Sequence, residues 1–164
     1  MLDSGADFLG ILRGLVDHEV EFIVVGGVCA VLHGAPVTTF DLDVVHRRSP
    51  ENIARLQAAL AGLGAHYRGR PGPPLAPDPS HLSGPDHHLL MTAAGPLDLL
   101  GAIGSGRGFE ELVDHTEGLE VSGMKLLVLD LETLIRVKEE TAREKDQLIL
   151  TLLRRLLRER DETA

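Results

Sequence analysis

Two aspartates, Asp41 and Asp43, stand inside a segment that otherwise favours a β-strand, residues 39–45. Aspartate is disfavoured in strands, so the pair restricts where this strand can lie. Side chains alternate across a strand, so both carboxylates share one face, whereas Phe40 and Leu42 are predicted to face the core. Like charges at this spacing repel each other unless solvent or a cation compensates. The pair therefore predicts either the solvated face of an edge strand or a divalent-metal site, because Mg²⁺ prefers carboxylate oxygens.

An earlier strand, residues 21–25, runs directly into Gly26 and Gly27 and then into a short helical pattern that ends near Gly34. Free backbone N–H groups and the positive end of the dipole at a helix start favour phosphate binding. A tight turn is the simpler interpretation of two glycines, and the spacing and lysine of a Walker A loop are absent. Together with the carboxylates on the next strand, the glycine pair predicts a phosphate seat beside a metal site.

Strand and helix patterns alternate along the chain, which predicts an α+β class, close to α/β, with a small mixed sheet flanked by helices. The spacing of apolar residues and the capping signals predict helices at residues 4–18, 50–63, 109–114 and 130–141. Further strands are predicted at residues 88–92, 97–103 and 119–129. A last helix, which completes a C-terminal helical region over 130–160, is expected to carry on one face Leu148, Ile149, Leu152, Leu153 and Leu156.

Residues 68–85 hold most of the prolines and are predicted to form a loop without regular structure. The length of 164 residues and the 43% hydrophobic content fit one domain, residues 1–164, with a sizeable core. The single cysteine, Cys29, excludes a disulfide framework and a cysteine-based zinc site, and it is expected to be a small buried side chain.

The chain has no apolar run of the length a membrane helix needs and no secretory signal at its N-terminus, so we expect a cytoplasmic protein without a membrane partner. A net charge of −9 argues against a broad electrostatic contact with a nucleic-acid backbone. A local basic patch in the C-terminal region stays compatible with RNA.

The glycine pair, the Thr-Phe-Asp-Leu-Asp segment at 39–43 and Asp98 in Pro-Leu-Asp-Leu-Leu occur in a familiar order. In this the chain resembles the minimal nucleotidyltransferases of the polymerase-beta-like superfamily. The resemblance continues through residues 97–112 and 128–146, which are similar to stand-alone bacterial members, some of them from toxin–antitoxin or abortive-infection loci. It implies metal-dependent transfer of a nucleoside monophosphate from an NTP to an acceptor, which could be an RNA end, a protein hydroxyl or a small molecule.

The resemblance also implies roles for individual residues. Asp41, Asp43 and Asp98 are implied to converge at a cleft, to hold two Mg²⁺ or Mn²⁺ ions, and to be the catalytic residues, with Asp98 helping to deprotonate the acceptor hydroxyl. The residues implied to bind the nucleotide are Gly26, Gly27, Thr39 and Lys138. A solvated helix end is the simpler interpretation of Lys138.

The resemblance assigns the basic residues that would contact the phosphates of an NTP less clearly than it assigns the aspartates. Arg143 and Lys145 are further candidates by resemblance, and a solvated helix end is again the simpler interpretation of both. Many stand-alone relatives carry an arginine at the position of Val37, and its absence makes a non-catalytic interaction module the alternative function. Such a module would bind a partner such as a small helical protein of a toxin–antitoxin pair.

Two other patterns compete for a function. The Gly-Ser-Gly-Arg-Gly segment at 104–108 follows a strand, but its spacing is not that of a dinucleotide-binding turn, so a chain reversal is the favoured interpretation. His81, Asp86, His87 and His88 cluster in the sequence without a regular zinc-ligand spacing. His33, at the predicted end of a short helix, is expected to be structural.

Overall fold

The computed structural model describes residues 6–163, apart from the side chain of Lys145. The strands are β1 (Phe22–Val25), β2 (Leu42–His46), β3 (His66–Tyr67), β4 (His87–Thr92), β5 (Gly95–Leu100), β6 (Thr116–Val121) and β7 (Met124–Leu129). The helices are α1 (Phe8–Asp17), α2 (Gly26–Leu32), α3 (Pro50–Gly62), α4 (Pro79–Leu82), α5 (Phe109–Leu112), α6 (Leu131–Glu140) and α7 (Gln147–Thr163), with 3₁₀ turns at Val113–His115 and Glu144–Asp146.

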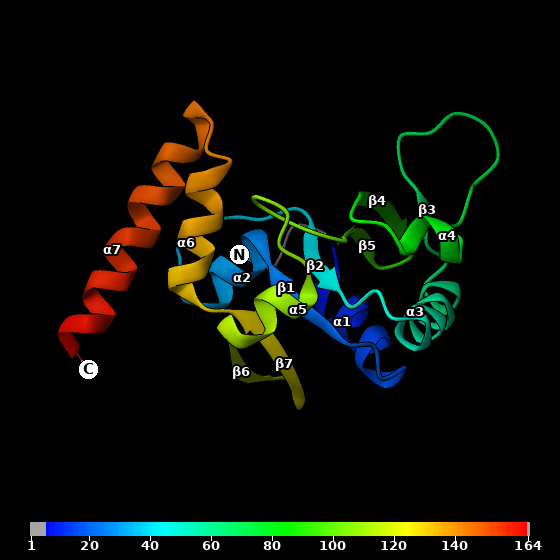
Figure 1. Cartoon of the computed structure of the whole chain (residues 1–164), viewed down its shortest axis with the longest axis horizontal. Helices are drawn as coiled ribbons and strands as arrows, with labels where there is room; N and C mark the ends of the chain where they lie inside the picture. Colours follow the sequence, from blue (N-terminus) through cyan, green and yellow to red (C-terminus); the bar gives the residue numbers. More distant parts are fainter. Residues whose placement is uncertain (1–5, 164) are drawn as a thin grey trace.

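The strands form one seven-stranded mixed sheet in the order β3-β4-β5-β2-β1-β7-β6, with helices around it (Figure 1). Strand β2 runs antiparallel to β1 and parallel to β5. The predicted α+β class with a mixed sheet and C-terminal helices is confirmed. Because β2 has a neighbour on each side, the interpretation of its aspartates as the solvated face of an edge strand is wrong.

Capping side chains set the starts of several helices. Ser49 accepts a hydrogen bond from the backbone N–H of Asn52 (3.3 Å) and Pro50 is the first helical residue, as the sequence predicts. Asp130 caps α6 in the same way, through the N–H of Thr133 (2.7 Å). Helix α1 begins at Phe8 and is capped by Asp7, so the predicted helix 4–18 starts too early: Ala6 and Asp7 are not helical, and residues 4 and 5 lie outside the described residues.

Three details of the sequence prediction are wrong. Phe40 does not face the core: its exposed fraction is 66%, because β2 begins only at Leu42 and Phe40 lies in the approach to it. The proline-rich segment is not without regular structure, since Asp78 caps the short helix α4. Leu148 does not lie on the buried face of α7: it is 70% exposed, and Leu150 is buried instead.

The two C-terminal helices lie side by side at one end of the sheet (Figure 1). An ion pair between Arg154 and Glu139 (2.8 Å) joins α7 to α6. Farther along α7, Arg160 donates to Nδ1 of His33 (3.0 Å), whose Nε2 donates to the carbonyl of Leu129 (2.7 Å). His33 is therefore a structural link between α2, β7 and α7, as predicted.

Within residues 6–163, no helix has the length and apolar content needed to cross a membrane.

Candidate functional site

Asp43 and Asp98 lie side by side in the middle of the sheet. They are direct partners in the parallel register of β2 and β5, so their side chains project from the same face. Asp98 is only 9% exposed and Asp43 is half-buried. Asp41 precedes β2, is half-buried, and acts on both through its charge. The structure thus brings together the aspartates that the sequence singles out.

Proximity and burial change the protonation of this pair. Burial, followed by the negative charges of Asp98 and Asp41, raises the pKa of Asp43 to about 7, and the charge of Lys138 opposes this rise. Burial also raises the pKa of Asp98, against the lowering influence of Arg68. Two carboxylates in contact cannot both ionise freely, so near neutral pH the metal-free pair is only partly deprotonated.

The predicted glycine pair lies against this carboxylate. Gly26 has φ +67°, a conformation that favours glycine, and a Cβ at this position would overlap Oδ2 of Asp43. A Cβ at Gly27 would overlap Oγ1 of Thr39, which donates to the backbone carbonyl of Asp41 (3.1 Å). The backbone at the start of α2 therefore lies so close to Asp43 and Thr39 that only glycine fits at these two positions.

Two cations act on the aspartates, Lys138 through its charge alone and Arg68 through an ion pair, and only Lys138 was predicted. Lys138 is half-buried on α6 and forms an ion pair with Asp146 (3.4 Å). Arg68, which no motif marks, has Nη2 2.8 Å from Oδ1 of Asp98 and Nη1 donating to the carbonyl of Leu90 (2.7 Å). The pairing of β3 with β4 brings Arg68 here, and that pairing joins segments far apart in the sequence.

The other predicted cations add little to this arrangement. Arg143 is exposed, and its backbone N–H donates to Oδ2 of Asp146 (3.0 Å). The side chain of Lys145 lies outside the described residues. Val37 is partly buried and packs against the core.

Comparison with known proteins supports the fold. No family model matches the sequence, and no curated protein matches it significantly. A protein from Thermotoga maritima, ascribed to the nucleotidyltransferases, is 19% identical with a TM-score of 0.60, over 97% of this chain and 96% of that chain. The lincosamide antibiotic adenylyltransferase LnuA, solved with lincomycin bound, is 12% identical with a TM-score of 0.59, over 90% of this chain and 94% of that chain.

A third structure, ANT(2″)-Ia in complex with adenylyl-2″-tobramycin, is 14% identical with a TM-score of 0.52, over 87% of this chain and 82% of that chain. The chain has the nucleotidyltransferase fold. The resemblance to the polymerase-beta-like superfamily is thereby confirmed for the fold. At these identities the likeness says nothing by itself of which substrates this chain takes.

The donor atoms in this nucleotidyltransferase fold suit a divalent cation. Oδ1 of Asp43 is buried, and no N–H or O–H group of the described residues donates to it. Within residues 6–163, no three His, Cys, Asp or Glu side chains form a ready-made metal cage. Mg²⁺ does not need one, because it usually takes one or two carboxylates and completes its shell with water and substrate phosphates. Asp43 and Asp98, with Asp41 nearby, fit that requirement.

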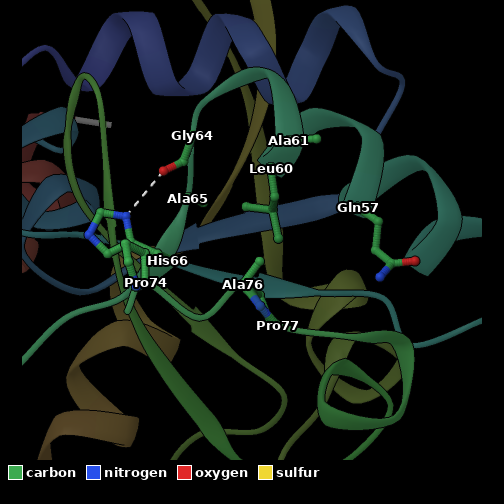
Figure 2. Close-up of a pocket in the computed structure, with 9 residues that line it drawn as sticks. All are labelled: Gln57, Leu60, Ala61, Gly64, Ala65, His66, Pro74, Ala76 and Pro77. Carbon is green, nitrogen blue, oxygen red and sulfur yellow. Dashed lines mark hydrogen bonds between the residues drawn. The ribbon is translucent and has the colours of Figure 1, made fainter. Parts of the chain in front are cut away.

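Two cavities lie near the same half of the nucleotidyltransferase sheet. One of about 540 Å³ is lined by Asp41, the exposed Phe40 and the β4–β5 turn, but not by Asp43 or Asp98. Another of about 570 Å³ lies between α3 and the proline-rich segment; Figure 2 shows Leu60, His66 and Pro77 among its lining residues. The second cavity contains none of the predicted site residues, so the first is the better candidate for substrate.

The competing patterns have structural explanations in this fold. Ile103 and Arg107 bridge across the 104–108 segment, so its glycines serve a chain reversal. Of the histidine cluster, His88 bonds to the hydroxyl of Tyr67 (2.9 Å) and His87 to the carbonyl of Ala102 (2.9 Å).

Cys29 is fully buried, as predicted. Its Sγ donates to the carbonyl of Leu129 (3.2 Å), and burial raises the pKa of the thiol to about 12. Cys29 is therefore a structural side chain.

Proposed function

We propose that the chain is a metal-dependent nucleotidyltransferase, which moves a nucleoside monophosphate from an NTP to a hydroxyl group of an acceptor. The observation that carries the proposal is the pairing of Asp43 with Asp98 on adjacent parallel strands. Gly26, which has no side chain, lets the backbone at the start of α2 lie against Asp43. A pair of carboxylates held in the interior costs stability unless a cation binds there, and such a cost is typical of functional sites.

In this proposal Asp43, Asp98 and Asp41 hold Mg²⁺ or Mn²⁺. The bound metal would neutralise charge on the phosphates and activate the attacking oxygen. Asp98 accepts a proton from the acceptor hydroxyl, as the resemblance implies. Gly26 and Gly27 let the triphosphate approach the backbone at the start of α2, and Lys138 adds a positive charge. Catalysis by these residues is positioning and charge neutralisation of an in-line displacement.

The acceptor stays open among an RNA end, a protein hydroxyl and a small molecule. The names of LnuA and of the ANT(2″)-Ia complex refer to small antibiotics, so small hydroxylated molecules are the first class to test. The cavity beside Asp41 and Phe40 would admit the acceptor next to the carboxylates. A nucleotide stacked on Phe40 is the other occupant it would fit.

The test is incubation of the purified protein with each of the four α-³²P-labelled NTPs and Mg²⁺, in three arms. The arms contain total RNA, cell extract proteins, or a set of hydroxylated small molecules. We expect label transfer in one arm with the wild type and none with Asp43→Asn. The matched control is Asp161→Asn, which changes an exposed aspartate on α7 and should leave transfer intact.

The alternative is the non-catalytic module, which the valine at position 37 favours. It would be supported if the wild type transferred no label in any arm and bound no NTP in equilibrium dialysis. Binding of an NTP without transfer would support the nucleotide site. It would indicate that none of the three arms contains the right acceptor.

A further inference from the structure

Arg68 lies where β3 meets the proline-rich segment, and three contacts fix it beside the aspartates. Its backbone N–H donates to the carbonyl of Leu89 (3.0 Å), and its Nη1 donates to the carbonyl of Leu90 (2.7 Å). Its Nη2 lies 2.8 Å from Oδ1 of Asp98. Because strand β4 holds both the backbone and one end of the guanidinium, the positive charge is kept at Asp98.

This ion pair engages a carboxylate that the proposed function needs for a metal. The side chain of Arg68 is 25% exposed and that of Asp98 is 12% exposed, so solvent screens the pair weakly. A carboxylate oxygen 2.8 Å from a guanidinium nitrogen is already partly neutralised, so it attracts a divalent cation less strongly than a free carboxylate would. The guanidinium and the metal also repel each other. Arg68 and a metal ion therefore compete for Asp98.

The other cations near the site are differently engaged. The amine of Lys138 pairs with Asp146, which belongs to the turn before α7. Position 37 holds a valine packed against the core. Within the described part of the chain, the ion pair observed for the three aspartates is the one between Asp98 and Arg68. Arg68 is thus the cation best placed to change its partner when a metal ion or a phosphate group binds at the site.

We propose that Arg68 is a displaceable counter-ion. In the metal-free protein it neutralises Asp98; when a divalent cation binds, it releases that carboxylate and pairs with a phosphate of the nucleotide. The proposal rests on the proposed function, since it requires the aspartates to bind metal and the site to bind a nucleotide. The exchange needs rotation of the side chain, which breaks the hydrogen bond from Nη1 to the carbonyl of Leu90, while the hydrogen bond to Leu89 holds the backbone of Arg68 in place.

The test compares Arg68→Gln with a matched control, Arg70→Gln. Arg70 lies two residues farther along the same segment, is exposed, and its Nη1 donates only to the carbonyl of Pro73 (3.1 Å) among the bonds observed. Calorimetric titration with Mn²⁺, without nucleotide, is expected to show tighter binding by Arg68→Gln than by the wild type, by about fivefold or more. Arg70→Gln should match the wild type.

A second titration uses inorganic tripolyphosphate in the presence of saturating Mn²⁺, which removes any dependence on the base. Arg68→Gln is expected to bind it about tenfold more weakly than the wild type, as the loss of one charge-assisted contact predicts. Tighter metal binding combined with weaker phosphate binding is a pattern that general loss of structure would not produce. Arg68→Lys keeps the charge, and should lie between the wild type and Arg68→Gln in both titrations.

The outcomes separate the two proposals. If the wild type binds Mn²⁺ and tripolyphosphate but Arg68→Gln equals Arg70→Gln in either titration, the role of Arg68 is overturned while the proposed function stands. If the wild type binds neither probe, both proposals fall. If Arg68→Gln does not fold, Arg68→Lys decides, and wild-type values in both titrations would overturn the role.

Discussion

At the scale of single residues, the protonation of Asp43 depends on influences of opposite sign. Burial and two neighbouring aspartates disfavour its charge, and Lys138 favours it. The sequence pattern singles out Asp43 as a candidate because alternation along a strand is a local property. It could not predict the partner Arg68, because an ion pair between β5 and the segment after β3 depends on the order of the strands in the sheet.

The raised pKa of Asp43 predicts how stability depends on pH in the metal-free protein. Between about pH 4 and pH 7 the folded chain keeps a proton on Asp43 that the unfolded chain has lost, so this residue makes stability fall as pH rises through that window. Asp43→Asn, which cannot ionise, should be more stable than the wild type at about pH 8, by the order of 1–3 kcal/mol. The difference should shrink toward about pH 4.

Urea unfolding in EDTA at both ends of the pH range measures this difference. Asp161→Asn, at an exposed position, is the control and should show no pH-dependent difference. An Asp43→Asn stabilisation that was the same at both ends would mean that the fold does not penalise the charge of Asp43.

Lys138 gives a second prediction at this scale. Its charge favours the ionised form of Asp43, and its ammonium lies at the edge of the site. Lys138→Ala is expected to weaken NTP binding and to lower kcat/KM about tenfold, with the larger effect on KM if the contact is already made in the ground state. Nucleotide binding and label transfer are measured separately. Arg154→Ala, which removes a cation from the α6–α7 contact, is the control, and full activity of Lys138→Ala would remove the assignment.

At the scale of elements, local signals predicted best where a cap and a proline coincide. Ser49 and Pro50 define α3 in the sequence and in the structure. The same combination, Asp78 followed by Pro79, begins α4, but it was hidden among the other prolines of the segment. Leu148 is a case in which local signals fail, because the buried side of α7 depends on how this helix packs on α6. The helix has leucines on several sides, so their periodicity alone does not indicate which side is buried.

The start of α2 supplies a prediction about an element. A Cβ at Gly27 would overlap Thr39, so Gly27→Ala must displace either α2 or the segment that leads into β2. We expect a loss of about 1–3 kcal/mol in the free energy of unfolding and loss of nucleotide binding. The control is Gly62→Ala at the end of α3, where a methyl group meets open space and should be neutral or slightly stabilising. Thermal unfolding and dialysis measure the two effects, and wild-type values for Gly27→Ala would refute them.

At the scale of the whole molecule, a ligand that binds only the folded state stabilises all of it. Mg²⁺ or Mn²⁺ is therefore expected to raise Tm, by about 2–4 °C for each kcal/mol of binding. The double variant Asp41→Asn with Asp43→Asn should lose that response. Calorimetric scans with and without the metal measure it, and a response that persisted in the double variant would place the ion elsewhere, with the histidines near α4 as the next candidates.

The order of the strands has a consequence for when the candidate site forms. Helix α3, strand β3, helix α4 and strand β4 all come between β2 and β5 in the sequence, yet β2 and β5 are neighbours in the sheet. Closing so long a loop is entropically costly and makes such pairings slow to form. During synthesis, a chain released from the ribosome only as far as β4 would hold Asp43 without Asp98 beside it. The pairing of Asp43 with Asp98 therefore comes into existence only after these two strands have met, and a chain that ends before β5 lacks it.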